Sequence, residues 1–175
     1  SKGRRQMGKL ASLTSSDNYF ENFEVGQVIR HARGKTITEL ENVNITNMVM
    51  NTAQGHFNVD QMSKTPLGKI LCYGGVSFSL VLGLASQDTV ENALAELGLD
   101  NIQLKTMVFH GDTLYAYSKV LQKRESDRED AGVVVFKHYG TNQNNELVAE
   151  IERTALIKKK SHWLERYENY RDDEE

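Results

Sequence analysis

The sequence has few residues that cross-link or interrupt a chain. Its 175 residues include one cysteine, Cys72, and one proline, Pro66. A single cysteine excludes an internal disulfide and a multi-cysteine metal site, and its place between Leu71 and Tyr73 favours a small buried residue. No apolar run reaches the roughly 18 residues that a membrane-spanning helix needs, and no apolar segment of a secretory signal follows the basic N-terminus. We therefore expect a cytoplasmic protein without a membrane partner.

An excess of charge of either sign is also missing. The chain carries 21 Lys and Arg residues against 24 Asp and Glu residues, which gives a formal net charge of −3. Because no basic stripe is present, nucleic acid is not expected as a partner. Hydrophobic residues make up 39% of the chain, enough for one core in a single domain of this length.

The first half of the chain predicts a strand followed by a capped helix. Residues 1–18 show no periodicity and are expected to form a mobile N-terminal tail. Residues 28–36 have the composition of a strand. Thr38 and Glu41 match a capping box, which predicts a helix that ends before the polar stretch beginning at Asn51. The apolar positions of this helix fall at roughly helical spacing and predict its buried face: Leu40, Val43, Ile45, Met48 and Val49.

The second half predicts a buried helix and an antiparallel sheet. After Gly74 and Gly75, the sequence VSFSLVLGLASQD is apolar nearly all round, as in a helix buried inside a domain. The following segments are β-rich and predict strands over residues 101–109, 113–123, 133–141 and 146–158. Residues 19–158 are therefore expected to form one α+β domain, a curved antiparallel sheet wrapped round a long buried helix.

The chain ends in a charged segment, residues 159–175. It carries Trp163, Tyr167 and Tyr170 at helical spacing. We expect a C-terminal tail helix whose aromatic face docks on the domain or on a partner subunit.

Polar residues gather at the junction between the two long predicted helices, in residues 51–74. This stretch holds His56 in a polar turn, and a second short helix is expected over residues 59–64, before Pro66. A polar junction between buried elements is usually a turn and sometimes an active site. His56 taken alone fits either a structural or a catalytic histidine. The other histidines have no partner in the pattern and are interpreted as surface or strand residues: His31, His110, His138 and His162.

Two stretches carry a resemblance to a known family. GHFNVDQMSKTPLGKILCYGG, followed by the apolar helix and later by MVFHGDTLYAYSKVL, resembles the MaoC-like acyl-CoA hydratase/dehydratase family, which has the hot-dog fold. His56 stands at the family's histidine position, Gly68 lies twelve residues further on as in the family, and Gly74 opens the helix. The sequence motif NTAQ-x-HF is similar to that of the mesaconyl-CoA hydratase (β-methylmalyl-CoA dehydratase) branch of this family, whose members act on a branched dicarboxylic acyl-CoA. The resemblance covers about residues 19–158.

The chain departs from the family at the positions around its histidine. The family's catalytic aspartate, five residues before the histidine, is Asn51 here. The family's asparagine and proline become Ala53 and Gln54, and the aspartate after the histidine becomes Asn58. Asn51 is either a feature of the branch or a loss of one catalytic group.

The resemblance implies a hydro-lyase that adds or removes water at an α,β-unsaturated acyl-CoA thioester. This chemistry needs a base for water, an acid for the α-carbon and donors for the enolate oxygen. His56 would exchange the protons, and Asn51, which cannot ionise, would orient water or a carbonyl through its amide. The backbone N–H groups of Gly74 and Gly75 would bind the thioester oxygen at the helix start. A tight turn that needs glycine is the alternative interpretation of this pair, and Asp60 is the nearest other carboxylate.

The resemblance also bears on ligands and partners. CoA is part of the substrate, so no separate cofactor is expected, and no spacing of His, Asp and Glu suggests a metal site. Basic side chains should line the CoA path; Lys64, Lys69 and Lys105 are candidates, with solvated surface lysines as the alternative. Family members pair in dimers with sites at the interface, so a homodimer or a larger homo-oligomer is expected. Two other functions stay open: a hot-dog thioesterase and a non-catalytic acyl-CoA-binding subunit.

Overall fold

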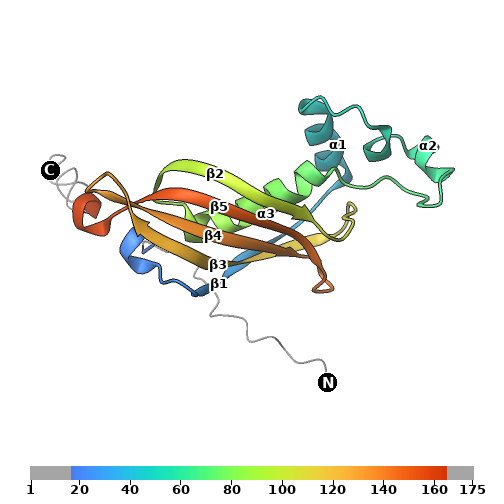
Figure 1. Ribbon diagram of the computed structural model, residues 1–175. Coiled ribbons are helices and arrows are strands. Elements are labelled where there is room, and N and C mark those ends of the chain that lie inside the picture. The colour runs from blue at the N-terminus through green and yellow to red at the C-terminus, as the bar shows by residue number, and fades with distance from the viewer. Residues whose placement is uncertain (1–16, 165–175) are drawn as a thin grey trace, which may run out of the picture.

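The computed structural model describes residues 17–164 (Figure 1). Its ordered elements follow the chain as η1 (Phe20–Asn22), β1 (Val28–Thr36), α1 (Glu39–Met48), η2 (Gln54–His56), α2 (Val59–Ser63), α3 (Gly74–Thr89), β2 (Ala93–Leu104), β3 (Thr113–Glu125), β4 (Ala131–Thr141) and β5 (Leu147–Lys158).

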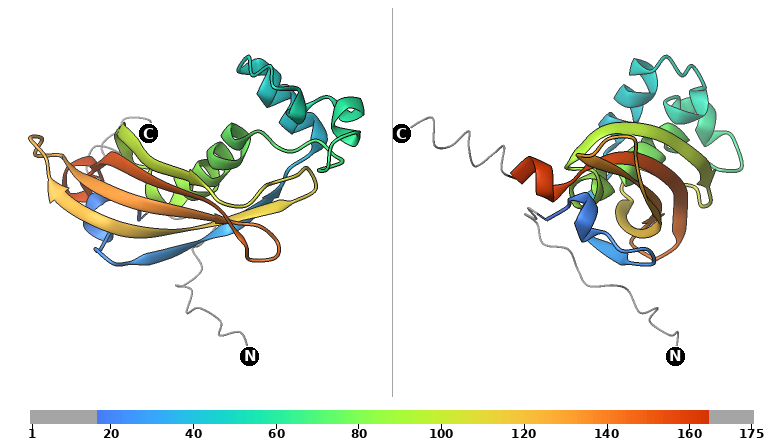
Figure 2. Two further views of the ribbon diagram at one scale, coloured as in Figure 1. Left: turned by 45° about the vertical axis from the view of Figure 1, so that its right-hand side comes forward. Right: turned by 60° about the vertical axis from the view of Figure 1, so that its left-hand side comes forward.

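The strands form one five-stranded sheet in the order β1-β3-β4-β5-β2, and every neighbouring pair is antiparallel. The sheet curls round α3, which lies on its concave side and contacts all five strands (Figure 2). This confirms the predicted architecture of a curved antiparallel sheet round one long helix. The helix packs directly on the sheet backbone at Gly140, where a Cβ atom would come within 2.3 Å of the Val81 side chain.

The core lies between α3 and the sheet in two clusters. One surrounds the first part of α3 and includes Val76, Val81 and Leu114, and the other includes Phe20, Phe23 and Phe136 near η1. The helix is not buried on every side, however. Ser79 and Gly83 are exposed, so the expectation of a helix apolar and buried all round holds for the face toward the sheet only.

Helix α1 buries a different face from the one that its sequence predicts. The capping box is present: the Thr38 hydroxyl accepts from Glu41 N at 3.2 Å, and Glu41 Oε2 accepts from Thr38 N at 2.9 Å. The predicted apolar face, however, is largely in solvent, with Leu40 69% and Met48 80% exposed. The buried residues of α1 are polar, Asn42 and Thr46. The reason lies in the architecture, because α1 projects beyond the end of the sheet and packs mainly against η2 and α3 (Figures 1 and 2).

Strand β2 is the other difference from the sequence prediction. It begins at Ala93 and ends at Leu104, whereas the sequence predicts a strand over residues 101–109. Residues 105–109 form an irregular segment. As an edge strand β2 has little buried surface and its register with β5 shifts at three places, so it lacks the alternation that marks a strand in the sequence. The other three predicted strands match β3, β4 and β5 closely.

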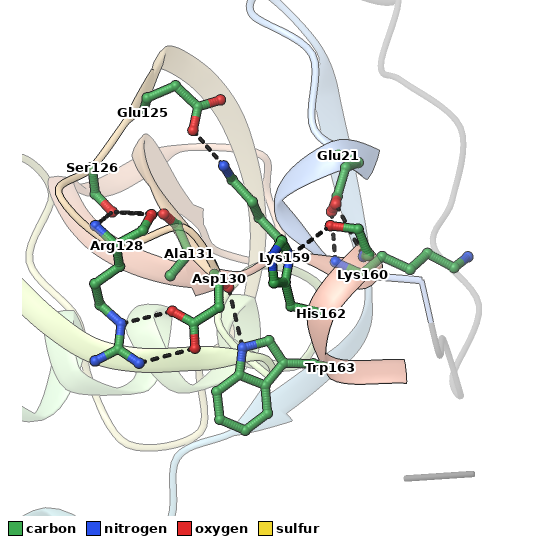
Figure 3. Close-up of polar contacts among 11 residues, drawn as sticks. Glu21, Glu125, Ser126, Arg128, Asp130, Ala131, Lys159, Lys160, His162 and Trp163 are labelled. Atoms are coloured by element: carbon green, nitrogen blue, oxygen red, sulfur yellow. Dashed lines mark hydrogen bonds and ion pairs between the residues drawn. The ribbon is translucent and has the colours of Figure 1, made fainter. Parts of the chain in front are cut away.

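The ends of the described chain meet beside η1 (Figure 3). Asn18, within the expected 1–18 tail, is buried and its Nδ2 donates to Gln87 O at 2.8 Å. Residues 160–164 are helical. The Glu21 carboxylate accepts from Lys160 N at 2.8 Å, and Trp163 Nε1 donates to Asp130 O at 3.1 Å. The described part of the C-terminal helix therefore docks on the domain through Trp163; Tyr167 and Tyr170 lie outside the described residues.

Candidate active site

The loop after α1 is held in place by its own short polar contacts. Met50 has a positive φ of 60°, which turns the chain out of the helix. The Asn51 side-chain oxygen accepts from Ala53 N at 2.9 Å, closing a local turn. His56 N then donates to Ala53 O at 3.1 Å within η2. The sequence of this loop thus places His56 at a defined point relative to α1.

The His56 ring is oriented by one backbone carbonyl. Its Nδ1 lies 2.9 Å from Leu71 O. A carbonyl oxygen can only accept, so the proton sits on Nδ1, and in the neutral ring Nε2 is left as an acceptor. The ring also lies against Tyr73, with centroids 5.7 Å apart. The half-buried histidine is therefore held in the tautomer that lets Nε2 take a proton.

Asn42 joins the histidine loop to the start of α3. Its Nδ2 donates to His56 O at 3.1 Å, and its Oδ1 accepts from Tyr73 N at 3.1 Å. The sequence analysis did not single out this residue. The available signal was the pair of polar residues, Asn42 and Thr46, at helical spacing between apolar positions of α1.

A pocket of about 220 Å³ lies beside these groups. Its walls include Leu71, Leu104, Met107 and Val148. Pockets for drug-sized ligands run from about 300 to 1,000 Å³, so this one suits a short acyl group better than a whole coenzyme. Cys72 also lines it, and burial, with a smaller contribution from the Asp112 charge, raises the pKa of its thiol to about 12. The thiol therefore stays protonated and is not a nucleophile.

Helix α3 opens at this pocket. Gly74 lines it, and Tyr73 at the N-cap makes no side-chain capping hydrogen bond. The first backbone N–H groups of a helix have no acceptor within the helix and carry its positive dipole end. A Cβ atom on Gly74 would lie 2.3 Å from Leu104 Cδ1, so glycine here lets the Leu104 side chain pack against the helix start.

The structure brings together some of the predicted site residues and not others. His56 and Gly74 line the same pocket, whereas Asn51 and Gly75 do not. Asp60 is on the surface, where it pairs with Lys64 at 2.7 Å. Within residues 17–164, no acidic side chain lines this pocket. Among the candidate lysines only Lys105 lines it; Lys69 stacks on the Phe109 ring, with Nζ 3.9 Å from the centroid.

A second polar cluster lies in the core, away from the pocket. His31 Nδ1 lies 2.8 Å from Asp88 Oδ2, and His31 Nε2 lies 2.6 Å from the Ser118 hydroxyl. His138 Nδ1 also contacts that hydroxyl, at 2.6 Å. A carboxylate, an imidazole and a hydroxyl in sequence resemble the groups that activate a serine nucleophile. Ser118 and His138 are 0% exposed, however, so no substrate reaches them. Both histidines lie in strands, in agreement with the sequence interpretation, and the structure adds the partners that the sequence pattern does not show.

Other kinds of site find no support in the described part of the chain. Residues 17–164 hold no cluster of three or more His, Cys, Asp or Glu side chains that could bind a metal ion. None of the helices described there is long and apolar enough to cross a membrane.

Comparison with known proteins places the chain in a family. A family model described as mesaconyl-CoA hydratase matches residues 12–159. The mesaconyl-CoA hydratase of Haloarcula marismortui is 32% identical over 158 residues, which cover 84% of this chain and 44% of that protein. The chain thus spans less than half the length of this curated relative.

Solved structures support the same assignment. A putative MaoC domain dehydratase from Chloroflexus aurantiacus superposes with a TM-score of 0.76 at 28% identity, covering 83% of this chain and 46% of that one. A Mycobacterium tuberculosis protein described as having a double hot-dog fold superposes with a TM-score of 0.73 at 20% identity, over 83% of this chain and 45% of that one. The second likeness concerns the fold alone. The chain has the hot-dog fold and belongs to the mesaconyl-CoA hydratase family.

Proposed function

We propose that the protein is a hydro-lyase that adds water to, or removes it from, the double bond of an α,β-unsaturated acyl-CoA thioester. The observation that carries this proposal is the fixed tautomer of His56 beside a pocket that also contains the start of α3. A proton acceptor and a set of backbone donors face the same small space, as the reaction requires. The names of the relatives favour a substrate of the mesaconyl-CoA or β-methylmalyl-CoA type.

The reaction can be written with the groups present. His56 Nε2 takes a proton from water as the water oxygen bonds to the β-carbon. The π electrons move toward the thioester, and the backbone N–H of Gly74, which lines the pocket, binds the oxygen on which negative charge develops. The imidazolium then returns a proton to the α-carbon, which restores the neutral ring. Dehydration is the reverse sequence.

Asn51 takes part less directly than His56 in this scheme. Its side-chain oxygen is engaged by Ala53 N, so only its NH₂ group can still donate. We propose that His56 carries out both proton transfers and that Asn51 shapes the loop through its hydrogen bond with Ala53 N.

The direct test is to incubate purified protein with mesaconyl-CoA or crotonyl-CoA and follow the absorbance of the conjugated thioester. Removing a general acid–base group lowers rates by about 10²–10⁴-fold, so His56→Ala should lose that factor. His110→Ala, at a half-exposed histidine outside the pocket, is the matched control and should keep wild-type activity. No turnover of either substrate, with His56→Ala indistinguishable from wild type, would sink the proposal.

One observation favours a different function. Because none of the described residues that line the pocket is acidic, acyl-CoA binding without chemistry is the second candidate. Tight binding of a saturated acyl-CoA by a protein that leaves both enoyl substrates intact would establish it. Release of free CoA thiol would instead identify a thioesterase.

We also propose that the protein is a homodimer joined at the β2 edge. In the described part of the chain no strand pairs with the outer edge of β2, and the exposed apolar side chains of β2 include Leu97, 52% exposed, and Ile102, 41% exposed. Unpaired edges with apolar side chains favour association with another chain. Leu104, at the end of this strand, lines the pocket, so pairing there would place each site at the interface.

Light scattering coupled to gel filtration tests the dimer. Ile102→Lys should convert it to a monomer, since it places a charge in the paired edge. Val25→Lys introduces the same charge at an exposed position, 63% in solvent, before β1 and should stay dimeric. A wild-type protein that elutes as a monomer at all concentrations contradicts this assembly.

A further inference from the structure

Asn42 is one of two buried residues of α1, with Thr46, in a helix whose apolar side chains are largely exposed. It is 0% exposed, although its neighbours Leu40 and Ile45 are 69% and 39% exposed. A buried amide is costly unless both of its polar ends are satisfied. Its burial against the loop and α3 is therefore the feature of α1 that needs an explanation.

Both ends of the Asn42 amide are satisfied by backbone groups of the candidate site. Nδ2 donates to His56 O, and Oδ1 accepts from Tyr73 N, each at 3.1 Å. The carbonyl can only accept and the N–H can only donate, so the orientation of the amide is fixed. Tyr73 is the N-cap residue of α3. One side chain thus ties the backbone of the proton-transfer residue to the backbone just before the oxygen-binding helix start.

We propose that Asn42 is a positioning residue that sets the separation between His56 and the N-terminus of α3. The inference rests on the proposed function of that site. In hydration the proton acceptor and the oxyanion donors act on the same substrate at once, and a misplacement of about 1 Å can cost about 100-fold in rate. Asn42 touches neither substrate nor reacting atoms and acts through the two backbones.

A leucine at this position would fill similar space and leave the His56 carbonyl and the Tyr73 N–H without partners. Asn42→Leu should therefore lower kcat by about 10- to 100-fold and change KM far less, because the pocket walls are intact. Thr46→Val is the matched control. Thr46 is equally buried on the same helix, and its hydroxyl donates to Asn42 O at 2.7 Å, within the helix. This variant should lose some thermal stability and keep kcat.

Asn42→Asp separates positioning from general stability. Its carboxylate can accept from Tyr73 N but cannot donate to the His56 carbonyl. Once protonated, it offers one O–H donor and one carbonyl acceptor, as the amide does, and burial raises the pKa of a carboxyl group. The ratio of Asn42→Asp to wild-type kcat should therefore rise as pH falls. The same ratio for Asn42→Leu should stay flat.

A readout independent of activity keeps the two proposals distinguishable. Nitrogen-15 NMR of the His56 ring should show the Nδ1–H tautomer in wild type and in Thr46→Val, and a shift toward Nε2–H in Asn42→Leu. If wild type hydrates neither substrate but the tautomer responds in this way, the proposed function fails and the positioning role stands. The role is overturned if Asn42→Leu keeps wild-type kcat and tautomer, or if Asn42→Asp shows no recovery at low pH.

Discussion

Acid should unfold this protein earlier than its surface charge suggests, because of the buried chain that runs from His138 through Ser118 and His31 to Asp88. Each hydrogen bond of this buried chain can be given a donor and an acceptor. His31 Nδ1–H donates to the Asp88 carboxylate, the Ser118 hydroxyl donates to His31 Nε2, and His138 Nδ1–H donates to the Ser118 oxygen. Both rings are neutral in this arrangement. A proton added to either ring would have to enter the core.

The charged groups near the rings set the direction of each pKa. Burial lowers the pKa of His31 below its ordinary 6.5, and the hydrogen bond and charge of Asp88 offset this only in part. Burial lowers the pKa of His138 well below 6.5, and the charges of Arg153 and His31 lower it further. Arg153 itself pairs with Glu96 at 2.9 Å. Below pH 6.5 the unfolded chain therefore binds protons that the folded chain does not, so stability present above that pH is lost as pH falls.

Each such histidine makes the free energy of unfolding fall by about 1.4 kcal/mol for each pH unit of acidification, over the pH range in which it is protonated in the unfolded chain and neutral in the folded chain. His138→Leu removes one of the two and should lower the slope by that amount between about pH 5 and pH 6. At neutral pH the change should be small. The substitution loses one hydrogen bond to Ser118, about 1 kcal/mol, but also removes Nε2, a buried acceptor with no partner, at about 1–3 kcal/mol.

Urea unfolding at a series of pH values measures this slope, provided that the m-value, the dependence of the free energy of unfolding on urea concentration, is the same in both proteins. His162→Asn, at an exposed histidine, is the control and should parallel the wild type. Equal slopes for His138→Leu and wild type would refute the reasoning, because they would mean that His138 takes up its proton in the folded state.

Three further substitutions test the pocket. Gly74→Ala should keep the fold, since the clashing Leu104 Cδ1 is the end of a flexible side chain, but should lower turnover by displacing Leu104, which lines the pocket, as activity beside a melting curve would show. Lys105→Met should reduce kcat/KM for mesaconyl-CoA more than for crotonyl-CoA if the lysine pairs with the second carboxylate; equal losses would assign it to the CoA portion. Asn51→Asp should preserve the turn, because a carboxylate also accepts from Ala53 N, and should keep or raise activity on crotonyl-CoA; a collapse of activity with an intact fold would show that the amide has a role of its own.

Much of the fold can be predicted from local sequence patterns. The strands that became β3, β4 and β5 alternate or are β-branched, and central strands of a sheet with one buried face must do so. The start of α1 follows from the capping box of Thr38 and Glu41, which needs only residues three apart. The location of His56 and Gly74 follows from spaced family matches. Each of these features is determined by short-range chemistry or by a recurring motif.

The remaining features depend on contacts between distant segments. Asn42 meets Tyr73 across 31 positions and His56 across 14, and no periodicity reveals such a pair. The chain of His31, Ser118 and His138 likewise joins three strands, so its members look isolated in the sequence. The Asp88 carboxylate and His31 are 57 positions apart in the sequence, so no local sequence pattern predicts their contact either.

The apolar spacing of α1 shows what a helical pattern can and cannot specify. It correctly predicts a helix, yet Leu40 and Met48 of that face lie in solvent, while Asn42 donates a hydrogen bond to the loop that carries His56. The same holds for β2, whose apolar Leu97 and Ile102 are exposed at the sheet edge. Exposed apolar side chains of a helix and of an edge strand are typical of surfaces that another chain covers. The periodicity of α1 therefore predicts a helix with one apolar face, and it does not specify whether the domain itself covers that face.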